Sequence, residues 1–249
     1  MTKRRVIAVL VLVVGVAVII FAGSRLFEAQ RLSRQTTLAY EAIAGQVKRE
    51  VASGARESAL GIPALSIDFD ALKEMNKDTA GWLYCPGTVI DYPVMSATDY
   101  SYYLEHLADG TLSMNGSLFI DYNNASDFSD PLTVIYGHHT YTGIMFGSLM
   151  GYKTQEYYDD HPYLYLYTPT GNYRVELLYG CVIGAGKWRD RAFMYSDNVG
   201  SFLDYAKHYT TFQSNTEYEQ GMRVVALSTC SYEFDGARYV VVGLLRPEV

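Results

Sequence analysis

From Gly81 onward the chain is a succession of short segments rich in tyrosine, valine and isoleucine, with turn residues between them. Residues 163–168, for example, alternate tyrosine and leucine before a threonine, and a turn at 170–172 separates them from the apolar run at 173–183. β-branched and aromatic side chains favour strands, and short strands at regular spacing are typical of sandwiches and barrels. About seven or eight such segments predict a mainly β domain that forms a closed or nearly closed β-barrel.

A long helix is expected to interrupt the strands over residues 196–212, directly before the last two of them. Ser196 or Asp197 can cap its first turn, and its carboxyl-terminal end carries Lys207 and His208. Its apolar side consists of Val199, Phe202, Leu203, Tyr205 and Ala206.

The amino-terminal segment predicts a membrane anchor. Three basic residues at 3–5 precede residues 6–23, which carry no charge, and Arg25 ends the run. Eighteen helical residues span about 27 Å, close to the roughly 30 Å of a hydrocarbon core. The basic cluster predicts a cytoplasmic amino terminus, an exported remainder and contact with membrane lipid. A signal peptide cleaved near residues 21–24 is the alternative, although its apolar core is normally shorter, about 7–15 residues.

The polar, helix-forming residues after the anchor predict a stalk or an amphipathic helix lying on the following domain. Gly54 and the Gly-Ile-Pro sequence at 61–63 mark its end, and Asp68 or Asp70 can cap a short helix just beyond it. The expected organisation is a tip and anchor at 1–24, a helical stalk at 25–62 and a β-barrel domain at 63–249.

The composition of the chain argues against nucleic-acid binding and against a metal or cofactor site. The chain carries 20 basic and 27 acidic side chains, a net charge of −7, and without the basic cluster at 3–5 the remainder carries −10. An acidic domain without a basic stripe is unsuited to nucleic acid. Neither zinc-like cysteine spacing nor a phosphate-binding glycine loop is present, so neither a metal nor a cofactor is expected.

The chain has three cysteines, so they cannot all pair with one another. Cys85 and Cys181 lie in apolar strand-like runs and are expected in the core. Cys230 instead ends the run Val-Val-Ala-Leu-Ser-Thr-Cys at 224–230, and Arg238 opens the next strand. A cysteine at a strand end beside a fixed arginine suits a thiolate that attacks a carbonyl group. The alternatives are a third core cysteine, or a Cys181–Cys230 disulfide that would block this chemistry.

A candidate base ends another apolar run, Pro-Leu-Thr-Val-Ile-Tyr at 131–136, which is followed by Gly137 and two histidines. A histidine just past a strand end, beside a glycine that permits close approach, suits proton transfer to and from a cysteine nucleophile. The alternative is a pair of surface loop histidines.

Together these residues resemble the active site of a sortase. The family motif is Thr-Leu-x-Thr-Cys, which this chain matches at 227–230 with Ala226 in the first position, and Tyr-Gly-His at 136–138 resembles the segment of the family's histidine. Further segments resemble class B sortases: 76–83, 90–94, 103–104 and 116–122. The resemblance implies that Cys230 is the nucleophile, that His138 rather than His139 transfers protons, and that Arg238 stabilises the oxyanion.

The resemblance also implies contacts with substrate at Ser228, Thr229, Leu104 and Tyr100. Tyr100 stands where class B enzymes often have asparagine, so a pentapeptide related to the family's Asn-Pro type is expected as readily as that type itself. Glu233 and Asp235 are candidates to steer an amine, although solvated loop carboxylates are commoner.

The activity implied is that of a cysteine transpeptidase. It would cleave a carboxyl-terminal sorting motif of secreted proteins after threonine and form a thioester. An amine of peptidoglycan, or of its lipid-linked precursor, would then receive the protein at the surface of a Gram-positive-type envelope; water would give hydrolysis instead. One alternative is a pilus-polymerising sortase, although residues 24–80 lack the Asp-Pro of such enzymes' lids. The other is a catalytically silent, membrane-tethered binding domain.

Overall fold

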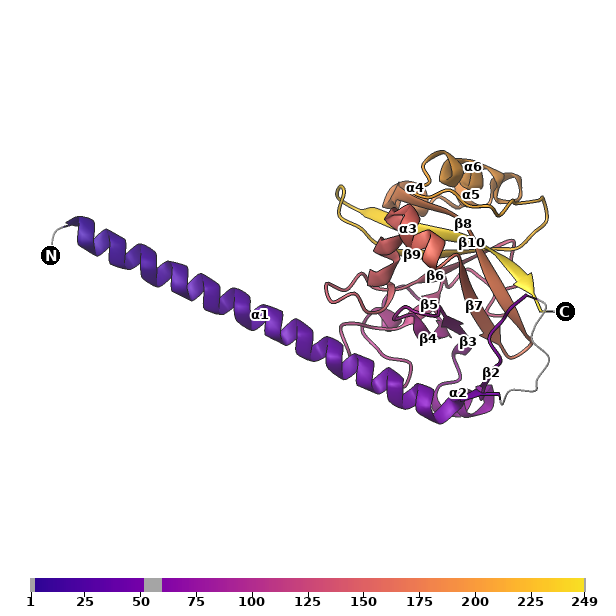
Figure 1. Ribbon diagram of the computed structural model, residues 1–249, viewed down its shortest axis with the longest axis horizontal. Helices are drawn as coiled ribbons and strands as arrows, with labels where there is room; N and C mark the ends of the chain where they lie inside the picture. Colours follow the sequence, from indigo (N-terminus) through magenta and orange to yellow (C-terminus); the bar gives the residue numbers. More distant parts are fainter. Residues whose placement is uncertain (1–2, 52–59, 249) are drawn as a thin grey trace.

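The computed structural model describes residues 3–51 and 60–248, so the predicted boundary at Gly54 lies outside the described residues. A long helix extends from a barrel that carries shorter helices on its outside (Figure 1). The elements in chain order are α1 (Lys3–Val47), β1 (Lys48–Glu50), β2 (Leu65–Ile67), α2 (Phe69–Met75), β3 (Thr79–Tyr84), β4 (Asp91–Ser96), η1 (Tyr102–Leu104), β5 (Leu118–Ile120), β6 (Leu132–Tyr136), η2 (Phe146–Lys153), α3 (Gln155–Asp160), β7 (Tyr163–Thr168), β8 (Gly171–Gly184), α4 (Ala185–Trp188), α5 (Arg191–Met194), η3 (Ser196–Val199), α6 (Gly200–His208), β9 (Val224–Cys230) and β10 (Ala237–Pro247).

Eight strands close the barrel in the order β10-β8-β7-β3-β4-β5-β6-β9, which confirms the predicted closed barrel of seven to eight strands. Most neighbouring strands are antiparallel, but β4 pairs with β5, and β6 with β9, in parallel. Parallel neighbours need a long crossover. Between β6 and β9 the crossover includes strands β7 and β8 and all the helices from η2 to α6. The last pairing brings two segments about ninety residues apart to one edge of the sheet.

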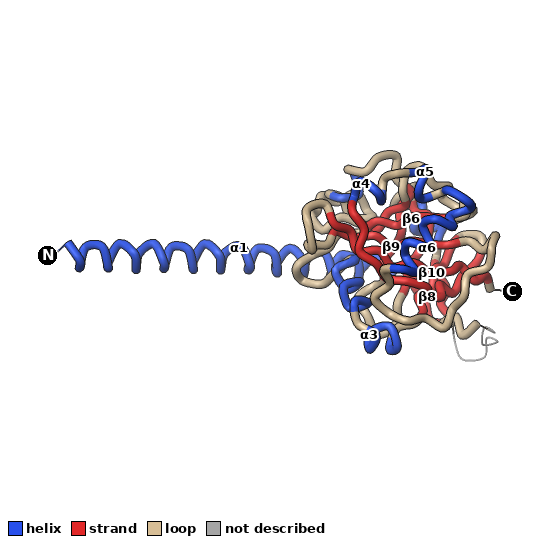
Figure 2. Tube along the Cα trace, turned by 90° about the horizontal axis from the view of Figure 1, so that it is seen from above, coloured by secondary structure: helices blue, strands red, loops and turns tan. Residues whose placement is uncertain are grey.

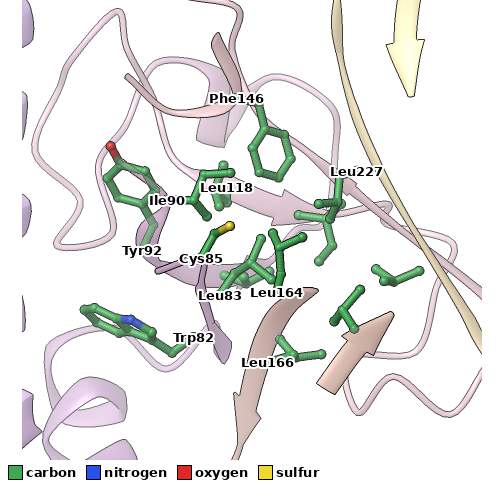
Figure 3. Close-up of a cluster of buried hydrophobic side chains, with 14 of the residues drawn as sticks. Trp82, Leu83, Cys85, Ile90, Tyr92, Leu118, Phe146, Leu164, Leu166 and Leu227 are labelled. Atoms are coloured by element: carbon green, nitrogen blue, oxygen red, sulfur yellow. The ribbon is translucent and has the colours of Figure 1, made fainter. Parts of the chain in front are cut away.

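Side chains alternate between two cores along the closing strands. Val225 and Leu227 of β9 face the barrel interior, which Figure 3 shows filled by side chains that include Leu83, Cys85 and Leu164. Val224 and Ala226 face outward instead, into a second cluster beneath α4, α5 and α6. Figure 2 shows these helices lying over the barrel beside β6, β9 and β10. Because side chains alternate along a strand, Ser228 and Cys230 also lie on this outer side.

The helix before the last two strands is present but shorter than predicted, since α6 covers only Gly200–His208. Asp197, Asn198 and Val199 have φ of 43°, 52° and 66°, so the chain turns through left-handed conformations and the helix starts after them. No side chain caps α6, and the predicted caps Ser196 and Asp197 are therefore wrong. For α2 the prediction is confirmed, because Asp68 Oδ1 accepts a hydrogen bond from Ala71 N at 2.9 Å.

Helix α1 runs without a break across the predicted boundary between anchor and stalk at 24/25. In the described part of the chain it is the one helix long and apolar enough to cross a membrane. Its second half packs on the barrel domain through a stripe of buried residues: Ser33, Thr36, Tyr40, Ile43 and Val47. The hydroxyl of Tyr40 donates to Gly116 O at 3.0 Å and meets Ser117 Oγ at 2.9 Å. The apolar first half projects away from the domain (Figures 1 and 2).

Candidate active site

The ends of β6 and β9 bring the predicted histidine and cysteine together. Their parallel register pairs Tyr136 with Ser228, and two further hydrogen bonds continue it. Gly137 N donates to Ser228 O at 3.2 Å, and Thr229 Oγ1 donates to Gly137 O at 2.8 Å. His138 and Cys230 lie two positions beyond this last register pair, His138 just past the end of β6, and both line one cavity.

Gly137 is the residue that permits this approach. A Cβ atom at this position would lie 2.6 Å from Leu118 Cδ2 and 2.7 Å from Phe146 Cδ2, well inside van der Waals contact. A side chain here would therefore displace the segment that carries His138. The packing of Leu118 and Phe146 therefore explains why a glycine directly precedes His138.

Arg238 faces the same edge from the next strand. In the antiparallel register of β9 and β10 it lies directly opposite Cys230, and residues that face each other in this way project to the same side of the sheet. Gly236, with φ of 72°, forms the turn between the two strands. Arg238 forms no ion pair within the described residues, and its Nη1 donates to Ala237 O at 3.0 Å. A guanidinium group is therefore available beside the thiol.

A cavity of about 160 Å³ lies at this edge. The seven residues singled out in the sequence all line it, although their catalytic and binding roles stay predictions. The full lining consists of Tyr100, Leu104, Phe119, Tyr136, Gly137, His138, Trp188, Arg189, Ser228, Thr229, Cys230 and Arg238.

The two histidines make different contacts. His138 Nε2 lies 2.8 Å from Leu104 O, and because a carbonyl oxygen only accepts, Nε2 carries the proton. Its Nδ1 makes no hydrogen bond within the described residues. His139 Nδ1 donates to Cys230 O at 2.8 Å, and its ring contacts Tyr232. His138 thus lies in the cavity wall, while His139 holds the backbone of the cysteine.

The three cysteines are free, so the Cys181–Cys230 disulfide is not formed. Cys85 and Cys181 are completely buried, as predicted, whereas Cys230 is partly exposed. Burial raises the pKa of the Cys85 thiol and raises that of Cys181 to about 12. Only Cys230 combines exposure with a place in the cavity wall.

Two tyrosines form one wall of the cavity, and a carboxylate behind them holds both. Tyr100 and Tyr136 donate their hydroxyl protons to Asp121 Oδ2 at 2.9 and 3.0 Å. Asp121 is only 7% exposed, and its Oδ1 accepts from the backbone and the side chain of Asn123. Burial, reinforced by the hydrogen bond to Asp121, raises the pKa of Tyr100 to about 12, and burial likewise raises that of Tyr136. Both hydroxyls therefore stay protonated at neutral pH.

The hydroxyls of Ser228 and Thr229 differ in whether they already have a hydrogen-bond partner in the protein. Thr229 uses its hydroxyl to hold Gly137. Ser228 is 1% exposed, and its Oγ has no hydrogen-bond partner in the described structure. A buried hydroxyl without a partner costs free energy, so this group is suited to bond a ligand in the cavity.

The loop after Cys230 is tied to a distant helix. Glu233 forms an ion pair with Lys153 of η2, so its carboxylate is less free to steer an amine than the sequence suggested. Burial is the largest single influence on Glu233 and opposes its ionisation, but the hydrogen bond and positive charge of Lys153 and further hydrogen bonds together outweigh burial and lower the pKa to about 2. The pair therefore persists until the pH falls to about 2.

Sequence reasoning missed three side chains of the cavity: Phe119, Trp188 and Arg189. Phe119 belongs to β5, where its pattern is that of any buried strand residue. Trp188 and Arg189 lie at the end of α4, which starts directly after β8. The signal available was the cluster of Lys187, Arg189 and Arg191 in an otherwise acidic domain.

No protein-family model matches the chain. Curated relatives do: the chain is 32% identical over 178 residues to Sortase B of Listeria monocytogenes serovar 1/2a (strain ATCC BAA-679 / EGD-e), covering 70% of this chain and 72% of the relative. It is 29% identical over 182 residues to Sortase B of Staphylococcus aureus (strain NCTC 8325 / PS 47), with the same coverages.

Solved structures give the same result. Sortase B from Bacillus anthracis in complex with AAEK1 matches with a TM-score of 0.71 and 26% identity, over 89% of this chain and 99% of that one. A Staphylococcus aureus sortase B–substrate complex matches with a TM-score of 0.67 and 27% identity, and a sortase B complexed with triglycine matches with 0.67 and 26%. Both matches cover 73% of this chain and 86% of the other.

Proposed function

The chain belongs to the sortase B family of cysteine transpeptidases, and on this premise we propose that it joins secreted proteins to the cell wall through a thioester on Cys230. The substrate is a carboxyl-terminal sorting peptide that is cut after threonine. The acceptor is an amine of peptidoglycan or of its lipid-linked precursor. The relatives described as complexes with substrate and with triglycine support a peptide and an amine as the two partners.

In the first half-reaction, the Cys230 thiol passes its proton to Nδ1 of His138, and the resulting thiolate attacks the carbonyl carbon of the threonine. The new C–S bond places a negative charge on the carbonyl oxygen, and the Arg238 guanidinium, directly across the strand pair, stabilises it. As the tetrahedral intermediate collapses, the C–N bond breaks and His138 gives a proton to the departing amine. The products are a thioester and a free carboxyl-terminal peptide.

In the second half-reaction, the acceptor amine attacks the thioester carbon. His138, held through Nε2 by Leu104 O, takes the amine proton on its other nitrogen. The C–S bond breaks, an amide forms and the thiolate of Cys230 returns. Water in place of the amine gives the hydrolysed peptide.

One observation carries this proposal. The parallel register of β6 and β9 and the antiparallel register of β9 and β10 bring His138, Cys230 and Arg238 to one cavity from three separate segments. A core cysteine or a pair of surface histidines would not require this convergence. We place the chain at the membrane of a Gram-positive-type envelope, with the apolar half of α1 as anchor, the amino terminus inside and the domain outside.

The test uses the full chain in neutral detergent, a library of carboxyl-terminal pentapeptides with threonine before the cleaved bond, and triglycine as the amine. Mass spectrometry should detect peptides whose threonine carboxyl is joined to triglycine. Cys230→Ala should abolish this product, while Cys181→Ala, which removes a buried thiol that does not line the cavity, should retain it. An unmodified library with the native chain would refute the proposal.

A further inference from the structure

The cavity is positively charged. Two guanidinium groups, Arg189 and Arg238, belong to its wall, and none of its described lining residues is acidic. This is unusual in a chain that carries net charge −7. Arg238 lies opposite the nucleophile, which leaves Arg189 as a second positive charge without an assigned task.

Three acidic groups near the cavity already have partners. Asp121, behind the tyrosines, accepts hydrogen bonds from both of them and from Asn123. Asp190 accepts from Ala192 N and Phe193 N as the cap of α5. Glu233 pairs with Lys153.

Arg189 also differs from the two basic residues beside it. Lys187 lies over the rings of Phe193 and Tyr205, at 4.5 and 4.4 Å from their centroids. Arg191 lies over the ring of Tyr195 at 4.5 Å. Within residues 3–51 and 60–248, the Arg189 side chain has neither a carboxylate nor a ring as partner.

The backbone fixes Arg189 at the cavity rim. It is the carboxyl-terminal cap of α4, and its N–H donates to Ala185 O at 3.1 Å. Strand β8 leads directly into α4, and the capped helix α5 follows one residue after Arg189. Of the three basic side chains in this segment, only Arg189 contributes to the cavity wall.

We propose that Arg189 is a specificity-determining residue that selects sorting peptides carrying a carboxylate side chain. The inference rests on the proposed function, because it names the chemistry of the peptide that this site takes. An acidic side chain in the peptide would complete an ion pair that the protein leaves open, and arginine suits the planar carboxylate by two parallel hydrogen bonds.

The test compares peptides in which each position except the threonine before the cleaved bond is in turn glutamine, glutamate or lysine. Glutamate and glutamine have the same shape, so a difference between them reports charge. Two readouts are used: KM for cleavage by the full chain in neutral detergent, and equilibrium binding to its Cys230→Ala variant. Binding is measurable whether or not the thioester chemistry occurs, so failure of this inference is distinguishable from failure of the proposed function.

For one position we expect glutamate to bind about three- to tenfold more tightly than glutamine at low salt, and less so at high salt. Arg189→Gln should abolish this preference, and Arg189→Glu should transfer it to lysine. The matched controls Lys187→Gln and Arg191→Gln should keep it. Equal binding of glutamate and glutamine at every position, or a preference that survives Arg189→Gln, would overturn the inference.

Discussion

At the scale of single residues, burial separates three chemically identical thiols. Cys85 and Cys181 have no exposed surface, and burial raises the pKa of both. A buried thiol is both inaccessible and protonated, and the thiolate is the reactive form. Cys230 is partly exposed at the end of β9.

We therefore expect iodoacetamide at pH 8 to modify Cys230 alone in the folded protein. Peptide mapping by mass spectrometry should find Cys85 and Cys181 unmodified until denaturant is added. A modified Cys181 in the folded chain, or an unreactive Cys230, would contradict the burial that separates them.

The neighbouring histidines should also differ in function. His138→Ala should lower kcat by about 10²–10⁴-fold, because it removes the proposed proton donor. His139→Ala removes the hydrogen bond to Cys230 O and the ring contact with Tyr232, and should lower kcat by about tenfold. Steady-state kinetics on the two variants tests this difference, after circular dichroism spectra have shown that both are folded like the native chain. Equal losses for both would show that this division of roles is wrong.

At the scale of elements, the site depends on how three strands align. The β9–β10 turn places Arg238 opposite Cys230, and the β6–β9 pairing brings His138 to the same edge. Gly137 belongs to this alignment because Leu118 and Phe146 pack where its side chain would lie. The wall of the cavity, by contrast, depends on Asp121, which holds Tyr100 and Tyr136.

Gly137→Ala should therefore displace the His138 segment. We expect the free energy of unfolding to fall by about 1–3 kcal/mol, as at other overpacked sites. We also expect kcat to fall at least about tenfold, because His138 is displaced. Urea unfolding and kinetics test this, with Gly186→Ala as the control, because a Cβ atom there meets nothing within 4 Å. Unchanged stability and activity in Gly137→Ala would contradict the steric account.

Asp121→Asn should weaken the tyrosine wall. The amide keeps the size of the carboxylate but accepts less strongly, so Tyr100 and Tyr136 should lose their fixed positions. We expect KM for the sorting peptide to rise about three- to tenfold, while Cys230 keeps its alkylation rate. Asp99→Asn, in an exposed turn that does not line the cavity, is the control. An unchanged KM in Asp121→Asn would remove the positioning role.

The sequence predicted those parts of the fold that local patterns encode. Strand alternation is local, so the barrel strands were readable from the sequence. The sequence also placed Arg238 at the start of the strand after Cys230, and the two residues are paired in the structure. The pairing of Tyr136 with Ser228 joins distant segments, and the sequence did not predict it. The strand-end positions and the family resemblance indicated only that His138 and Cys230 act together. The contacts of Asp121 with Tyr100 and Tyr136, and the place of Arg189 at the cavity, arise from tertiary packing, which local sequence patterns do not encode.

At the scale of the whole molecule, helix α1 has two halves with different surroundings. Its first half is apolar and projects away from the domain, and its second half packs on the barrel domain. Its packed stripe is partly polar, because Ser33 and Thr36 bond to Thr142 and Ser113. The sequence therefore offered a helix lying on the domain as one alternative but did not identify the residues that pack. The exposed Leu26 and Leu38 lie outside the packed stripe. The packed half begins near Ser33, beyond the anchor predicted to end at residue 24.

Removal of residues 1–24 should therefore leave the domain folded, with a Tm unchanged within about 2 °C. Removal of residues 1–41 also deletes Tyr40 and its bonds to Gly116 and Ser117, and should lower Tm by roughly 5–10 °C. Calorimetry on both truncated chains tests this. Equal Tm values would contradict the packing of α1 as part of the domain.

The central claim is that acyl transfer takes place on Cys230 within the cavity that it shares with His138 and Arg238. The most direct measurement is the intact mass of the full chain after incubation with a cleavable sorting peptide and no amine. The account predicts an added mass equal to the peptide fragment ending in threonine, located on Cys230, absent in Cys230→Ala and discharged by triglycine. An adduct on another residue, or product formed by the Cys230→Ala chain, would contradict it.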